Sequence, residues 1–166
     1  MLRALAVAPP GHWPPEAAAT VTLGYDDRHR RRVVLVADSG MRFLLDLPET
    51  TLLHEGDGLQ LEDGSWLVVR AAAEDLVEVT APEREALVRF AWHLGNRHLP
   101  ADLGLDRILI RDDHVIVDML RRLGATVRRV RTPFNPERGA YQASQAHHQH
   151  DHAHGHPHHH DHDHDE

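Results

Sequence analysis

The chain of 166 residues contains no cysteine and no lysine. The absence of cysteine excludes disulfide bonds, thiolate metal sites and cysteine nucleophiles, so any metal site must use histidine, carboxylate or backbone ligands. All eighteen basic residues are arginine, which we attribute to the base composition of the genome and not to function.

Long apolar runs are also missing. No segment approaches the roughly 20 apolar residues that a membrane-spanning helix needs. The start of the chain resembles a signal peptide only faintly, because the apolar stretch 4–8 is short and is followed by Pro9 and Pro10. We therefore expect a soluble, cytoplasmic protein that does not bind membranes.

The signatures of common enzymes are absent as well. The sequence has no phosphate-binding loop, no serine-hydrolase elbow, no zinc-protease motif and no dinucleotide fingerprint. No nucleophile stands beside a candidate base, which predicts that the protein is not an enzyme. The formal net charge is −8, and residues 147–166 supply five acidic side chains and no arginine. The remainder is only mildly acidic, which argues against a nucleic-acid partner.

Histidine is concentrated at the C-terminus, where residues 147–166 hold eleven of the seventeen histidines. This segment has no apolar run to offset its ordering entropy, so we expect a disordered tail. Neutral imidazole suits nickel, copper and zinc, which predicts that the tail binds several metal ions. A purification tag would be an unbroken run, whereas these histidines alternate with Asp, Ala, Gly and Pro. The candidate ligands are His147, His148, His150, His152, His154, His156, His158, His159, His160, His162 and His164.

The remaining residues predict an α+β fold of two domains. Residues 1–74 form a β-rich domain, because short apolar segments alternate with turn residues, including two Asp-Gly pairs that are strong hairpin signals. Many short strands at this spacing favour a small sandwich or barrel. The expected strands are residues 4–7, 20–24, 32–37, 42–47, 58–61 and 66–71.

Residues 75–146 show the order βαββαβ, which is that of a ferredoxin-like domain. A capping box at Thr80 and Glu83 is expected to begin the first helix, and Gly95 to end it. Asp112 or Asp113 is expected to cap the second helix. The expected elements are a strand 76–79, a helix 80–95, extended segments 99–103 and 107–111, a helix from 112 or 113 to Gly124, and a strand 126–130.

Three histidines of this domain are candidate metal ligands. His93 and His98 bracket the end of the first helix, and His98 continues an apolar stripe, so that it could emerge at the edge of the apolar face. A lone histidine there is more often a hydrogen-bonded structural residue than a ligand. His114 lies at the start of the second helix, where the helix dipole favours its neutral, metal-binding form.

Two other groups of charged residues have structural interpretations. Arg28 and Arg30 to Arg32 form a basic run that is expected to be a solvent-exposed hairpin arm. Asp57 and Asp63, in the two glycine turns, are expected to accept local backbone hydrogen bonds.

Several stretches together resemble one family. They are FLLDLPETTLLHEGDGLQLEDGSWLVV (43–69), HLGNRH (93–98), DHVIVDMLRRLGA (113–125), PFNPERGAY (133–141) and the His/Asp tail. This combination covers most of the chain and resembles UreE, the urease accessory nickel chaperones. The resemblance implies a homodimer that pairs through the ferredoxin-like domains, with His98 of each subunit supplying a shared nickel site. Some members carry a His-x-His pair before the second helix, where this chain has Asp112, Asp113 and His114.

The resemblance further implies delivery of Ni²⁺ to apo-urease together with an accessory GTPase, with tail histidines completing the metal shell. Its first domain resembles a peptide-binding module, which implies protein contacts. Ligand type alone does not select nickel, because imidazole binds Cu²⁺ more tightly and also suits zinc. Two alternatives remain: a passive store of nickel, zinc or copper that acts through its tail, and an enzyme with a metal-binding appendage.

Overall fold

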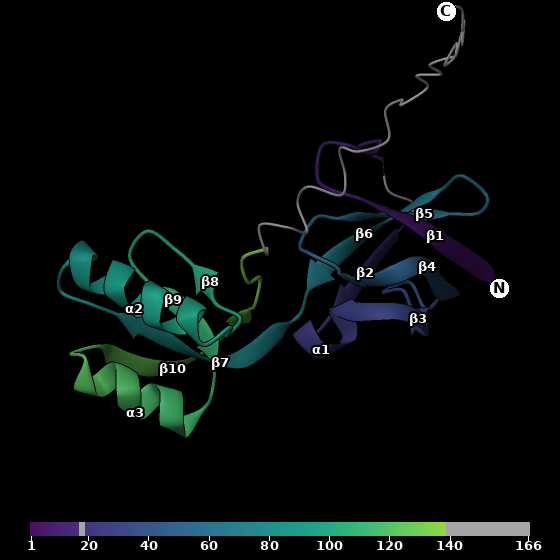
Figure 1. Ribbon diagram of the computed structural model, residues 1–166. Helices are drawn as coiled ribbons and strands as arrows, with labels where there is room; N and C mark the ends of the chain where they lie inside the picture. The colour runs from purple at the N-terminus through teal and green to yellow at the C-terminus, as the bar shows by residue number, and fades with distance from the viewer. Residues whose placement is uncertain (17–18, 139–166) are drawn as a thin grey trace, which may run out of the picture.

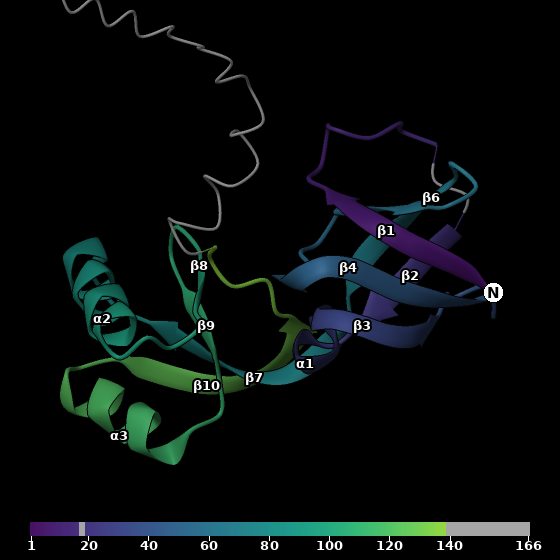
Figure 2. The ribbon, with the colours of Figure 1, turned by 45° about the vertical axis from the view of Figure 1, so that its right-hand side comes forward.

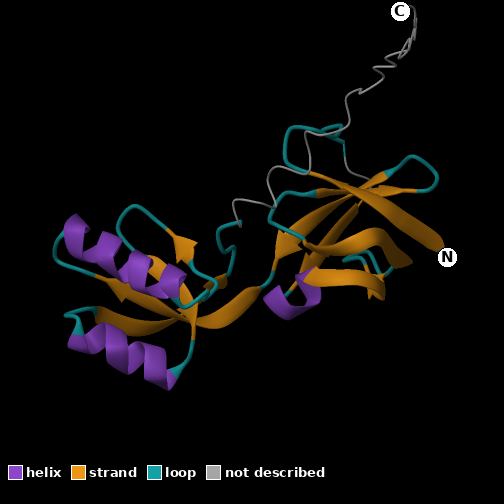
Figure 3. Ribbon diagram, viewed as in Figure 1, coloured by secondary structure: helices purple, strands orange, loops and turns teal. Residues whose placement is uncertain are grey.

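The computed structural model describes residues 1–16 and 19–138 and shows an α+β fold built on two separate sheets (Figure 1). The first part is almost entirely strand, whereas the second carries two longer helices (Figure 3). The expected division into a β-rich and a ferredoxin-like part is thereby confirmed. The limits 1–74, 75–146 and 147–166 stay a prediction, and the expected disorder of the tail concerns residues outside the described part.

The first sheet is six-stranded, in the order β2-β6-β5-β1-β4-β3. It is curled, which agrees with the expected barrel, and its inner face is lined by fully buried residues such as Phe43, Leu45 and Leu67. The strands are β1 (Leu2–Ala8), β2 (Ala19–Leu23), β3 (His29–Val36), β4 (Arg42–Leu52), β5 (Gly58–Leu61) and β6 (Trp66–Ala71).

One carboxylate links the two edges of this curled sheet. Asp38, in the turn after β3, accepts hydrogen bonds from the hydroxyl groups of Thr20 and Thr22 on β2, at 2.7 and 2.8 Å. The Asp38 amide donates in turn to the Thr20 carbonyl at 2.8 Å. These bonds lower the pKa of the Asp38 carboxyl below its ordinary value, because they stabilise the ionised form.

The second domain confirms the ferredoxin-like prediction. Its sheet has the order β10-β7-β9-β8, and neighbouring strands pair antiparallel. Apolar residues of both helices pack on one face of the sheet in a single cluster that includes Phe90, Val79 and Leu120. The elements are β7 (Ala73–Thr80), α2 (Arg84–Asn96), β8 (Asp102–Leu103), β9 (Ile108–Arg111), α3 (His114–Arg122) and β10 (Thr126–Pro133).

The two helix starts differ from each other. Asp113 caps α3 as expected, because its side chain accepts from the amides of Val115 and Ile116 at 2.9 and 3.3 Å. The expected cap at Thr80 is wrong. Thr80 still belongs to β7, where it pairs with Thr126, and α2 begins four residues later. Pro82 explains this delay, because the residue before a proline is driven away from helical backbone angles.

The basic run is split between two environments. A one-turn helix, α1 (Tyr25–Arg28), precedes β3 and lies where β7 and β10 approach the first domain (Figure 2). Arg30 to Arg32 are exposed on β3 as expected, but Arg28 is completely buried, so for this residue the expected solvent-exposed arm is wrong. No helix in the described ranges is long and apolar enough to cross a membrane.

Candidate metal centre

His98 lies just beyond the C-terminus of α2, in a tight helix-ending turn. Arg97 is the last cap residue, and the His98 amide donates to the Gly95 carbonyl at 2.9 Å. The Leu99 amide donates to the Leu94 carbonyl at 3.2 Å. This pair of bonds defines a Schellman motif, and Leu94 and Leu99 belong to the same apolar cluster, as the motif favours.

The turn places His98 differently from the sequence-based expectation. The helix does not end at Gly95 but includes it, and His98 is not a further member of the helical stripe. Instead its backbone has φ = 57°, in the left-handed region. Glycine usually holds this position, because a side chain there clashes with the backbone. The stripe of Leu87, Ala91 and Leu94 ends inside the core, and His98 projects beyond it as an exposed residue.

His98 is the only non-glycine residue with a positive φ in residues 1–16 and 19–138. Residues held in such angles concentrate at functional sites, where the surrounding structure supplies the energy that the strain costs. Here the helix-ending bonds and the packing of the partly buried Leu99 against the apolar cluster supply it. A histidine in place of glycine at this turn is therefore an argument for a role beyond packing.

The helix that precedes His98, α2, carries exposed apolar side chains. Val88 and Trp92, one helical turn apart, are 69 % and 64 % exposed. His93 contacts Trp92 edge to face, with ring centroids 5.0 Å apart, and its carbonyl accepts from Arg97 at 3.2 Å. His93 is half-buried and so has less room for a shared ligand than His98.

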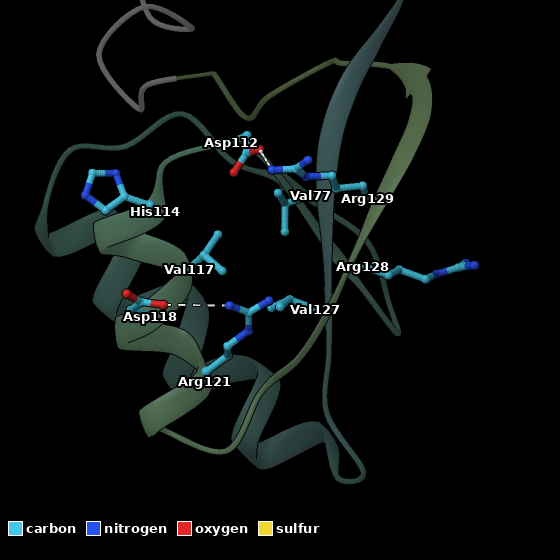
Figure 4. Close-up of a pocket in the computed structure, with 9 residues that line it drawn as sticks. All are labelled: Val77, Asp112, His114, Val117, Asp118, Arg121, Val127, Arg128 and Arg129. Atoms are coloured by element: carbon cyan, nitrogen blue, oxygen red, sulfur yellow. Dashed lines mark ion pairs between the residues drawn. The ribbon is translucent and has the colours of Figure 1, made fainter.

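His114 lies apart, at the first residue of α3, beside a cavity of about 160 Å³ between α3 and β10. Two carboxylates line this cavity with it and are already paired, Asp112 with Arg129 at 2.9 Å and Asp118 with Arg121 at 3.7 Å. Figure 4 shows the His114 ring pointing away from Asp112. The Asp112 and His114 side chains therefore do not point to a common position here (Figure 4), and a mixed Asp/His metal site stays a prediction.

Within the part of the chain that the structure describes, no three His, Asp or Glu side chains are placed to hold one metal ion. A single copy of this part thus offers several separate exposed histidines, of which His98 is the one with a left-handed backbone. The eleven tail histidines lie outside the described residues.

The sequence does not predict the position of one further histidine, His54. His54 is buried, with 6 % exposure, and neither of its ring nitrogens has a hydrogen-bond partner among the described residues. Its pKa is lowered below the ordinary value, first by burial and then by the nearby guanidinium of Arg138, against the attraction of Asp57. Nothing in its local sequence signals this, because its burial comes from long-range packing.

Comparison with known proteins gives matches over both domains. The sequence models described as UreE urease accessory protein, N-terminal and C-terminal domain, match residues 2–72 and 74–164. The chain is 55% identical over 134 residues to the urease accessory protein UreE of Chelativorans sp. (strain BNC1), covering 78% of this chain and 85% of that protein. It is 47% identical over 149 residues to UreE of Beijerinckia indica, covering 89% and 86%. It is 52% identical over 137 residues to UreE of Ruegeria pomeroyi, covering 82% and 89%.

Proposed function

Because the chain belongs to the UreE family of urease accessory proteins, we propose that it is a nickel metallochaperone that delivers Ni²⁺ while the urease active site matures. It is an accessory protein and not the urease itself, and we propose that it has no catalytic activity of its own. Its partners would be apo-urease and the accessory GTPase that supplies the nucleotide chemistry, and its compartment the cytoplasm.

The observation that carries the proposal is the exposed His98 in a left-handed backbone conformation. In a homodimer with a two-fold axis near this turn, one residue per chain makes a pair of imidazole ligands. The exposed Val88 and Trp92 on the same helix supply apolar surface that a second copy would cover. Their position supports dimerisation through the ferredoxin-like domains.

Two imidazoles leave a nickel ion incompletely coordinated, and we propose that tail histidines complete the shell, with water in their place when the tail is removed. Such a site suits delivery, because an acceptor with a better-organised ligand set can remove the metal. A closed four-ligand cage would instead be a structural site. Zinc and copper suit the same ligands, so nickel rests on the family and not on the donor atoms.

The test is nickel titration by calorimetry on a chain that ends at Ala146, with His98→Ala compared with the unsubstituted form. One tight nickel per dimer should be lost, because the substitution removes two ligands from one site. Each factor of ten in affinity corresponds to about 1.4 kcal/mol, so the loss of two ligands should weaken the site by orders of magnitude. His93→Ala and His12→Ala serve as controls and should change the affinity far less.

Dimerisation is measured separately by sedimentation, so that loss of the dimer is not mistaken for loss of a ligand. A tight nickel per dimer that survives His98→Ala would refute the site and would direct attention to His93 or His114. Loss of all tight binding with the tail, before any substitution, would favour the passive store.

A further inference from the structure

Residues 133–138 form a strap that leaves β10 and runs between the two domains. Phe134 is completely buried among Leu76, Leu109, Val130 and Tyr25, and its ring centroid lies 5.2 Å from that of Tyr25. Pro136 is also buried. A six-residue loop with two buried side chains is an ordered element and not merely the lead into the tail.

The strap is fixed to the first domain by a buried arginine. Arg28 donates from one guanidinium nitrogen to the Phe134 carbonyl and from the other to the carbonyl of Leu53, at 3.2 Å. The amide oxygen of Asn135 accepts from the Glu55 amide at 3.1 Å and lies 3.5 Å from Arg28. Asn135 therefore ties the strap to the loop 53–57 of the first domain.

The far end of the strap is also anchored there. Arg138 donates to Asp57 at 2.8 Å, and Asp57 is only 2 % exposed. The second Asp57 oxygen accepts from the His54 amide at 2.7 Å. The carboxylate thus has its expected backbone bond, and it also holds a residue 81 positions away, a role that the sequence does not signal.

The same strap holds the segment that follows His98. The Asn135 amide donates to the carboxylate of Asp102 at 3.1 Å, and the Glu137 amide donates to the Ala101 carbonyl at 3.0 Å. Ala101 is three residues beyond His98, so an extended chain places their Cα atoms at most about 10 Å apart. The strap therefore contacts the chain three and four residues after His98.

The strand pairing of this segment is short. β8 has only two residues, Asp102 and Leu103, and it is an edge strand that pairs with β9 alone. Two residues of pairing hold an edge strand poorly. The strap bonds to Ala101 and Asp102 thus add to the apolar packing of Leu99 and Ala101 in fixing the chain between His98 and β9.

From these contacts we infer that Asn135 is a positioning residue for the His98 metal site. Held by Arg28 and the loop 53–57, it fixes the Ala101–Asp102 segment and with it the direction in which His98 presents its imidazole. The first domain is thereby linked to metal binding without contributing a ligand. The expected effect of Asn135 on nickel affinity rests on the proposed nickel site at His98, whereas its expected effect on the order of the turn does not.

The first arm of the test needs no metal and uses the full chain. Asn135→Ala removes the acceptor of the Glu55 and Arg28 hydrogen bonds, whereas Asn135→Asp keeps that acceptor and serves as the conservative control. Amide hydrogen exchange should become several-fold faster at His98 and Leu99 in Asn135→Ala, and should remain unchanged at Val79 in the core. Should Asn135→Ala fail to fold, Asp102→Ala removes the strap bond from the other side, with the same expected result.

The second arm is a double-mutant cycle on nickel affinity, measured by chelator competition in the full chain. Loss of residues that orient a metal ligand typically weakens binding by about 10–100-fold. We expect Asn135→Ala to weaken tight nickel binding about tenfold. Asn135→Asp should keep the affinity of the unsubstituted chain. When His98 is already alanine, Asn135→Ala should not weaken nickel binding further. Asp38→Ala, in the turn after β3 where Asp38 bonds to β2 of the first sheet, controls for general destabilisation and should leave the affinity unchanged.

Each outcome decides between the possibilities. The inference is overturned if Asn135→Ala speeds amide exchange at Val79 as much as at His98 and Leu99. It is also overturned if Asn135→Ala still weakens nickel binding when His98 is already alanine. An unchanged tight site in His98→Ala alone refutes the proposed nickel site, and the exchange arm then still decides whether Asn135 orders the turn.

Discussion

His98 occupies at the end of α2 the position that Gly124 occupies at the end of α3. Each is the residue after the helix cap, and each has a left-handed backbone, with φ = 57° and 94°. Each donates its amide to the carbonyl three residues back, at 2.9 Å from His98 to Gly95 and 3.0 Å from Gly124 to Arg121. The second domain thus contains the same helix-ending turn twice, once with the glycine that this backbone conformation favours and once with a histidine.

The comparison predicts that His98→Gly makes the fold more stable while it removes the proposed ligand. A side chain in the left-handed region costs about 1–2 kcal/mol, and the greater freedom of unfolded glycine offsets part of that gain. The free energy of unfolding should rise by about 0.5–1 kcal/mol. Urea unfolding followed by circular dichroism measures it, without metal.

Gly124→Ala is the matched control, because it places a side chain in the same backbone conformation. Nothing lies within 4 Å of a Cβ built there, so steric contact does not add to the backbone strain. The free energy of unfolding should fall by about 1 kcal/mol. Destabilisation by His98→Gly would show that the imidazole is a structural group.

A second pair of substitutions tests two other glycines. A Cβ on Gly58 would lie 2.5 Å from Cγ of Trp13, whose indole stacks near Trp66 and donates to the Gly56 carbonyl at 3.2 Å. Gly58→Ala should therefore displace the Trp13 loop, lower stability and change tryptophan emission. Gly95→Ala meets nothing within 4 Å inside α2, so it should raise stability by up to about 1 kcal/mol. Equal effects of the two would contradict this account of Gly58.

How far the sequence determines this fold can be seen at the two helix starts. Asp113 caps α3 as the sequence predicts, because a cap is a contact over two or three residues. Thr80 and Glu83 satisfy the same local pattern, yet β7 extends through Thr80 by pairing with β10. The strand pairing is long-range, and it prevails over the local capping preference.

The candidate site shows the same limit. The sequence selects His98 through its motif, but its left-handed backbone depends on the packing of Leu94 and Leu99, which the pattern does not report. Arg28 looks like any arginine of a basic run, but contacts with the Phe134 carbonyl, 106 residues away, and with the Leu53 carbonyl hold it in the interior. Contacts of this separation leave no periodic signal in a single sequence.

Stability should depend on pH through His54. Burial lowers the pKa of its imidazole, and the guanidinium groups of Arg138 and Arg28 oppose protonation further, against the carboxylate of Asp57. The unfolded chain takes up a proton near pH 6.5, whereas the folded chain stays neutral to a lower pH. The free energy of unfolding should therefore fall as pH drops below about 6.5, by at most about 1.4 kcal/mol per pH unit, until the folded imidazole titrates.

His54→Leu removes this contribution with little loss, because the ring nitrogens have no partner among the described residues. The difference between the two unfolding curves, measured in urea from pH 7.5 to pH 5, isolates His54 from the carboxylates. The variant should show the flatter profile. Parallel profiles would mean that His54 does not titrate differently in the folded chain.

Removal of residues 147–166 distinguishes metal binding by the tail from metal binding at His98. These residues hold eleven of the seventeen histidines, so the nickel bound per chain should fall several-fold in equilibrium dialysis. The far-ultraviolet circular dichroism per chain should keep the contribution of both sheets, because the strands and all three apolar clusters lie within residues 2–134. A chaperone should retain one tight ion per dimer at His98, whereas a passive store should retain none. Unchanged stoichiometry would show that the tail is not the main metal-binding segment, and the proposal for the tail would then fail while that for His98 would stand.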